Sequence, residues 1–215
     1  MPWHSIAECK GTGQNCHGVI CGTGPTGDWL DRICESYPGA IKIAINKAIV
    51  LRDDFDYLFV DAAATLDALW RWHKNAKAIC MPWWSRGKLN INEVITQVLA
   101  DKICLYHWAY DDWNALTMPE HTLNDLNLYI NWGNLQSALH FCKRLGISEI
   151  ELVGCDGGEM NGRIFASKVC ETFPAPSHPR KNIKDYRRCN KRVDEIARYL
   201  QIRINYATDP AARLA

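Results

Sequence analysis

The chain has 215 residues, of which 47% are hydrophobic and 23% are charged, and its formal net charge is +1. This length suffices for one hydrophobic core but not for two full domains, and the small net charge gives no overall field that favours nucleic acid or a membrane surface. No apolar run reaches the roughly 18–20 residues of a membrane span, and residues 1–5 do not resemble a secretory signal, so we expect a cytoplasmic protein without a transmembrane segment.

Short apolar runs along the chain predict β-strands, because each has strand length and is rich in β-branched residues. Most of the runs are continuous and do not alternate with polar residues, which is typical of strands covered on both faces of a parallel sheet. The runs are residues 18–21, 40–45, 57–61, 76–81, 102–107, 149–154 and 202–206.

Apolar residues at helical spacing occupy the stretches between these strands, at residues 65–73, 92–100, 135–145 and 191–200. Strands that alternate with helices predict an α/β fold, here a single Rossmann-like domain with a mostly parallel sheet and helices on both faces.

The predicted domain takes residues 18–215, after an N-terminal extension of residues 1–17 to which the sequence assigns no role. Two long stretches, at about residues 107–128 and 156–184, match no regular element. Connections of this length are often functional, so we expect both to be lid-like loops beside an active site.

The ten cysteines are expected to be reduced thiols. Cys21, Cys80 and Cys104 lie in predicted strands, where cysteine acts as a small hydrophobe, and the cytoplasm keeps thiols reduced. The spacing of Cys9, Cys16 and His17 matches no zinc template, so no metal site is predicted there.

A glycine-rich turn, Gly22–Thr26, follows the first predicted strand and precedes a helix. Small residues let the backbone approach a ligand closely, and a helix after such a turn presents free N–H groups to a phosphate. The alternative is a plain tight turn. Gly22, Gly24 and Gly27 also satisfy the GxGxxG pattern, but the second predicted strand is followed by Asn46, where a dinucleotide site has an acidic residue.

Several segments, in this order along the chain, resemble the bacterial sialyltransferases of the small, single-Rossmann type and the related DUF115 group, which includes an archaeal pterin pyrophosphokinase. The resemblance covers roughly residues 18–61 and 129–206. The segments that carry it are Gly22–Thr26, Asn46, Phe55–Asp61, Trp132-Gly133 and Leu145–Asp156.

In those sialyltransferases the turn and the Asn after the second strand contact the cytidine nucleotide of the donor. The resemblance therefore implies nucleotide or substrate contacts for the turn residues, for the polar residues after the second and third strands, and for the pair before the helix at 135–145. These residues are Gly22, Thr23, Gly24, Pro25, Thr26, Asn46, Asp61, Trp132 and Gly133.

The resemblance also implies a histidine base and tyrosines on the leaving phosphate. His178 is the first candidate for the base, although its spacing to the last helix differs from the family pattern, and His107 after the fifth strand is a second. Asp156 is a third catalytic candidate, because it follows the carboxyl end of a strand. The alternative for each histidine is a residue without a catalytic task.

A basic segment near the end of the chain contains Tyr186, Arg187 and Arg188. It could stabilise a leaving phosphate without a metal, or bind a polyanionic acceptor such as a nucleic acid. The alternative is a solvated helix face.

Three hypotheses follow for the function. The first is a glycosyltransferase that needs no cofactor and moves a sugar from a nucleotide-sugar donor, with a CMP-linked sugar as the candidate, to an acceptor hydroxyl on a glycan, a small molecule or a nucleic acid. The second is a Mg²⁺-dependent pyrophosphokinase of the DUF115 type, in which Asp61, Asp111 or Asp156 holds the metal. The third is a nucleotide- or nucleic-acid-binding module without catalysis. The oligomeric state is left open.

Overall fold

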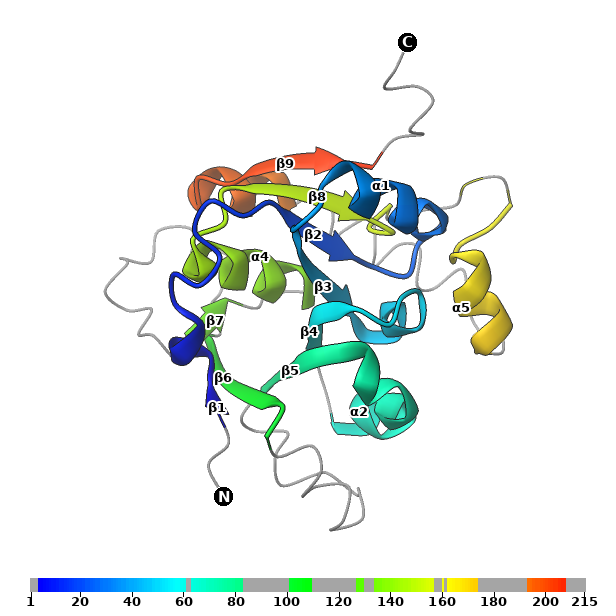
Figure 1. Ribbon diagram of the computed structural model, residues 1–215, viewed down its shortest axis with the longest axis horizontal. Helices are drawn as coiled ribbons and strands as arrows, with labels where there is room; N and C mark the ends of the chain where they lie inside the picture. The colour runs from blue at the N-terminus through cyan, green and yellow to red at the C-terminus, as the bar shows by residue number, and fades with distance from the viewer. Residues whose placement is uncertain are drawn as a thin grey trace.

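A computed structural model describes residues 4–60, 63–82, 101–109, 127–129, 134–156, 160, 162–173 and 193–207 (Figure 1). Its centre is a parallel sheet in the order β1-β6-β5-β4-β3-β2-β8-β9, with β7 paired to the end of β6. The strands are β1 (His4–Ser5), β2 (Gly18–Cys21), β3 (Ile41–Ile45), β4 (Phe55–Phe59), β5 (Ala76–Pro82), β6 (Ile103–Ala109), β7 (Asn127–Tyr129), β8 (Glu149–Val153) and β9 (Arg203–Tyr206).

Every strand pairing among the described residues is parallel, as the continuous apolar runs predict. All seven predicted strands are present, with ends that differ from the prediction by at most two residues. The α/β fold class is therefore confirmed. None of the helices in the described part of the chain is long and apolar enough to cross a membrane.

Helical segments cover both faces of the sheet. One buried cluster packs α1 (Leu30–Ser36), the 3-10 helix η3 (Asn46–Val50), α2 (Ala63–Leu69) and α5 (Ser167–Thr172) against one face. A second cluster packs α4 (Asn134–Leu145) and the helical residues 193–199 against the other.

Two of the predicted helices differ from the expectation or lie outside the described residues. The one expected at residues 65–73 forms as α2 followed by a 3-10 helix, η4 (Trp70–Asn75). The one expected at residues 92–100 lies outside the described residues.

The predicted long loops need correction where they are described. The stretch at 156–184 contains α5 and an isolated bridge between Met160 and Arg163, so it is not without regular structure. The stretch at 107–128 begins inside β6 and ends inside β7. Short strands and helices of this kind escape sequence patterns because too few residues show the period.

The N-terminal segment is part of the sheet. β1 pairs with β6, and a 3-10 helix, η1 (Ile6–Cys9), places the fully buried Ile6 in the cluster on the α4 face. A capping box begins η1, in which the Ser5 Oγ accepts from the Ala7 N–H and the Glu8 carboxylate accepts from the Ser5 N–H. Residues 4–17 therefore contribute an edge strand and core contacts.

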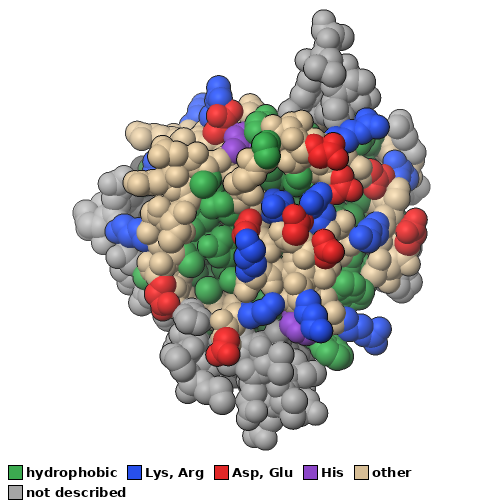
Figure 2. All heavy atoms as spheres, in the orientation of Figure 1, with side chains coloured by type: hydrophobic (Ala, Val, Ile, Leu, Met, Phe, Trp, Pro, Cys, Tyr) green, Lys and Arg blue, Asp and Glu red, His purple; other side chains and the backbone are tan. Residues whose placement is uncertain are grey.

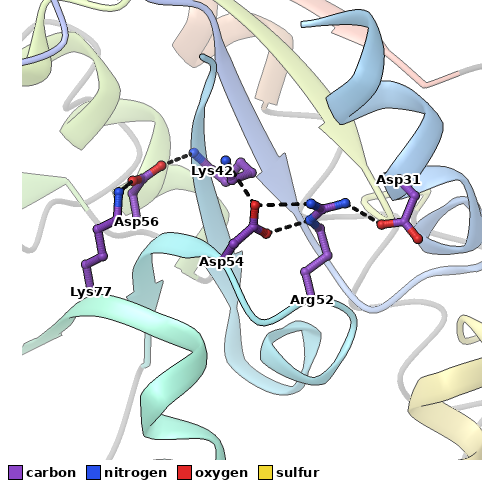
Figure 3. Close-up of polar contacts among 6 residues, drawn as sticks. All are labelled: Asp31, Lys42, Arg52, Asp54, Asp56 and Lys77. Atoms are coloured by element: carbon purple, nitrogen blue, oxygen red, sulfur yellow. Dashed lines mark hydrogen bonds and ion pairs between the residues drawn. The ribbon is translucent and has the colours of Figure 1, made fainter. Parts of the chain in front are cut away.

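A row of ion pairs crosses β3, β4 and β5 and connects the sheet to α1 (Figure 3). Arg52 holds Asp54 through two nitrogens, at 2.7 and 3.1 Å, and also pairs with Asp31 of α1. Lys42 lies 3.3 Å from the same Asp54 carboxylate. Figure 2, in the same orientation as Figure 1, shows acidic and basic side chains interspersed over the centre of this face.

Hydrogen bonds from Arg52 lower the pKa of the Asp54 carboxyl. A carboxyl with a lowered pKa in the folded state contributes stability above its ordinary pKa, and that contribution is lost as the pH falls through the folded value. We expect Arg52→Gln to lower the free energy of unfolding by about 0.5–1 kcal/mol at pH 7, with a smaller loss in high salt. Urea unfolding of both proteins, from pH 7 downwards, measures the difference.

Lys77→Gln is the matched control, because Lys77 is 78% exposed and pairs only with Asp56 among the ion pairs described. Its effect should be close to zero. An Arg52→Gln deficit that keeps its full size in acid and in high salt would contradict the electrostatic explanation.

Candidate functional site

The strand order reverses direction at β2. From β2 the chain adds β3, β4, β5 and β6 on one side, and β8 and β9 lie on the other side. Ligands of open α/β sheets bind at such a switch point, beyond the carboxyl ends of the strands. The predicted turn and Asp156 follow β2 and β8 at this point.

The register of the strands sets which residues meet there. Cys21 at the end of β2 is level with Ala44 of β3 and Val153 of β8. Thr23 and Asn46 follow the carboxyl ends of the neighbouring strands β2 and β3, and a Cβ on Gly24 would lie 2.4 Å from the Asp156 Oδ2. The parallel register thus brings together the first turn and two further predicted site residues.

The two turns approach so closely that only glycines fit. The Gly24 N–H donates to the Gly154 oxygen over 2.7 Å. A Cβ on Gly22 would lie 2.4 Å from that same oxygen, and Gly154 itself has a φ of +64°. Gly22 and Gly24 therefore serve a backbone-to-backbone contact between the turns after β2 and β8.

Thr26 and Asp156 bond the two turns together. The Asp156 carboxylate accepts from the Thr26 N–H at 3.0 Å and from the Thr26 hydroxyl, and the Thr26 oxygen accepts from the Gly154 N–H at 2.7 Å. Thr26 is buried, at 5% exposure. Asp156, a predicted catalytic residue, is thus a hydrogen-bond acceptor for the turn.

Most N–H groups of the turn already have acceptors within the protein, which limits how the turn could bind a phosphate. Its N–H groups at Gly22, Gly24 and Gly27 donate to backbone oxygens, the one at Thr26 donates to Asp156, and Pro25 has none. A phosphate that used the Thr26 N–H would have to displace the Asp156 carboxylate. Thr23 and Gly24 are the turn residues that stay half-exposed.

The segment before α5 packs on the outer side of the same turn. The Asp28 carboxylate accepts from the Ser167 N–H at 2.7 Å and from Arg163 at 2.7 Å, and the Ala166 N–H donates to the Thr23 oxygen at 2.9 Å. Burial opposes ionisation of Asp28, but the bonds from Ser167 and Arg163 outweigh it and lower its pKa. The turn is therefore held from both sides.

An asparagine pair lies at this edge. Asn46 begins η3 with a φ of +51°, a left-handed conformation that Asn tolerates better than most residues. Its Oδ1 accepts from the Asn134 Nδ2 at 3.0 Å. Asn134 begins α4, is 4% exposed, and its own Oδ1 is a buried acceptor without a partner among the described residues.

An unpaired buried acceptor is costly, so a donor on a ligand would find a favourable partner in the Asn134 Oδ1. The sequence-based assignment did not include Asn134. The sequence feature that could have pointed to Asn134 is its place between Trp132-Gly133 and an apolar helix. Asn is a favoured residue type at the start of a helix.

Among the remaining candidates, His107 lies far from the turn after β2, and the others lie outside the described residues. His107 lies within β6 and does not follow the strand, and β6 is four strands from β2, or roughly 19 Å at about 4.8 Å per strand. The side chain of His107 is outside the described part, as are the following candidates: Asp61, Trp132, Gly133, His178, Tyr186, Arg187 and Arg188.

Thiol chemistry and metal binding are the other two possibilities at this edge. Cys155 is half-buried between Gly154 and Asp156, and burial raises the pKa of its thiol to about 12, so it is protonated at neutral pH and is a poor nucleophile. Within the described ranges, no three His, Cys, Asp or Glu side chains lie close enough to hold a metal ion.

The parallel sheet with helices on both faces defines an α/β protein of the Rossmann-like class. Its candidate site lies at the topological switch point, beyond the carboxyl ends of β2 and β8. No protein-family model matches the chain, and no curated protein matches it.

The bond network around Thr26 gives a direct test of the site's construction. We expect Thr26→Val to lower the free energy of unfolding by about 2–3 kcal/mol, because the buried Gly154 N–H loses its acceptor and Asp156 loses a donor. Thr26→Ser keeps both bonds and should cost less than about 1 kcal/mol. Denaturant unfolding measures both variants, and equal losses would show that the hydroxyl contributes nothing.

Proposed function

We propose that this chain is a glycosyltransferase that binds a nucleotide-sugar at the switch-point edge and transfers the sugar to an acceptor hydroxyl. The observation that carries the proposal is the convergence of the turn after β2, Asn46 and Asn134 at one edge of the sheet. Nucleotides bind at this position in open α/β sheets, and the same turn and Asn carry the resemblance to nucleotide-sugar-dependent enzymes.

The polar groups at this edge suit the nucleoside part of such a donor. The asparagine pair is neutral, the Asn134 Oδ1 is a buried acceptor, and Thr23 offers a half-exposed hydroxyl. Ribose hydroxyls and base amino groups are donors that match an acceptor of this kind. The acidic residue with which NAD-binding proteins hold both ribose hydroxyls is replaced here by Asn46, which favours a different nucleotide.

The chemistry follows from the class of donor. An acceptor hydroxyl attacks the anomeric carbon, the bond from that carbon to the phosphate oxygen breaks, and the nucleotide leaves with the electron pair. The hydroxyl proton passes to a base, for which His178 is the sequence candidate. The edge residues bind and orient the donor, and they take no part in proton transfer.

A thermal-shift panel of nucleotides and nucleotide-sugars, each with and without Mg²⁺, tests the proposal. A ligand that binds only the folded chain, at about 100 times its Kd, should raise the melting temperature by roughly 5–10 °C. We expect this shift with a CMP- or UDP-linked sugar, independent of Mg²⁺, and we expect Asn46→Ala and Asn134→Ala to abolish it.

Asn205→Ala is the matched control, because Asn205 lies in β9 and its described bond is to Glu149, away from the turn. It should leave the shift unchanged. A shift with a nucleoside triphosphate only when Mg²⁺ is present would replace this proposal with the pyrophosphokinase, and no shift with any ligand would refute a nucleotide site. Release of free nucleotide on addition of an acceptor then separates transfer from binding alone.

A further inference from the structure

Two stacked aromatic rings join the ends of the segment that runs from β2 to α1 and contains the turn at Gly22–Thr26. His17 directly precedes β2, and Tyr37 directly follows α1. Their ring centroids lie 3.8 Å apart, and the angle between the ring planes is 2°. We call His17 and Tyr37 the ring clamp, because the stack holds together the start of β2 and the end of α1.

A carboxylate of β8 lies beside the ring clamp. The Glu151 side chain is fully buried, and its Oε2 accepts from the Tyr37 hydroxyl at 3.4 Å. The same oxygen lies 4.0 Å from the His17 Nε2, which is too long for a hydrogen bond. The His17 Nε2 is a buried nitrogen without a hydrogen-bond partner among the described residues. Stacking, and not a hydrogen bond at Nε2, therefore holds the imidazole in place.

The charged groups around the ring clamp come from three strands. Glu149 of β8, like Glu151, lies on the side of His17, and it pairs with Arg203 of β9. On the other side of β2, Lys42 of β3 pairs with Asp54 at 3.3 Å. Burial of the imidazole outweighs the attraction of the two β8 carboxylates and lowers the pKa of His17. His17 is therefore neutral at pH 7.

We infer that the ring clamp is a proton-sensitive contact, in which neutral His17 holds the end of α1 on the sheet and uptake of one proton by His17 releases it. A charged imidazolium loses hydration in this largely buried place, where only 15% of the side chain is exposed, and regains it when the ring turns toward water. The His17 backbone stays in place, because its oxygen accepts from the Ile41 N–H at 2.9 Å. Only the ring leaves, and Tyr37 loses its stacking partner.

The release acts on the last turn of α1. The two buried side chains of α1 are Leu30 and Ile33, each 2% exposed, and both lie in the first four residues of the helix. Nearer its end, the half-buried Cys34 and Tyr37 pack against the same core cluster. The turn at the other end of the segment is held separately by the bonds of Thr26, so the ring clamp opens without them.

The direction of the pKa shift of His17 sets the pH window. Below the ordinary pKa of histidine, about 6.5, the unfolded chain binds a proton at His17 that the folded chain does not bind. The stability that the ring clamp contributes is therefore complete above this pH, and it is lost as the pH falls toward the pKa of the folded state. One proton changes the unfolding constant by at most about tenfold per pH unit.

The first test is an NMR titration of the labelled full-length protein from about pH 8 to about pH 5. The His17 ring should titrate with a midpoint below about 6.5, and nuclear Overhauser cross-peaks between the His17 and Tyr37 rings should be present at pH 7 and disappear as His17 takes up its proton. A midpoint at or above the ordinary value would overturn the inference, as would cross-peaks that persist when His17 is protonated.

Urea unfolding of two variants isolates the contribution of His17. His17→Phe keeps a stacked ring that takes up no proton, so the unfolding constant of the wild type should rise relative to that of His17→Phe by up to about tenfold between about pH 6.5 and about pH 5.5. His73→Gln is the matched control, because His73 lies in η4 and its Nδ1 contacts the Trp70 oxygen at 2.7 Å. It should keep the pH dependence of the wild type.

Parallel pH curves for the wild type and His17→Phe would contradict a proton-sensitive contact at His17. Neither the titration nor the unfolding curves depend on whether the chain binds a nucleotide, because both are measured without any ligand.

Discussion

The candidate site depends on one contact, the packing of the turn after β2 against the turn after β8. The two backbones approach until the Gly24 N–H reaches the Gly154 oxygen, and a Cβ at Gly22 would leave no room for this approach. Thr26 then closes the contact by bonding Gly154 and Asp156 at once. Because β2 and β8 flank the point where the strand order reverses, the same contact shapes the switch-point edge.

This contact also determines what the edge offers a ligand. The Asp156 carboxylate already takes the Thr26 N–H, so the turn carries its own anion. The other polar groups at this edge are neutral, namely the half-exposed Thr23 and Asn46 and the buried amide of Asn134. Such groups recognise sugars and bases through hydrogen bonds, and a charged phosphate would have to compete with Asp156 for the turn.

The strands could be predicted because sheets covered on both faces need apolar side chains at almost every position, as in Val19, Ile20 and Cys21, all fully buried. β1 and α5 could not be predicted, because they are held by partners distant in the sequence. β1 pairs with β6, and the first N–H of α5, that of Ser167, donates to the Asp28 carboxylate. Asn134 was missed for a related reason, since its burial and its bond to Asn46 come from the docking of α4 on the sheet.

The sequence by itself determined the parallel α/β fold, the order of strands and helices in the chain, and the turn at Gly22–Thr26, because these follow from local periodicity and small residues. Only the tertiary structure decided which side chains meet at that edge of the sheet: Asp156 with Thr26, and Asn134 with Asn46. Those partners are 130 and 88 positions apart along the chain. Their meeting depends on strand order and register, which no local pattern of residues encodes.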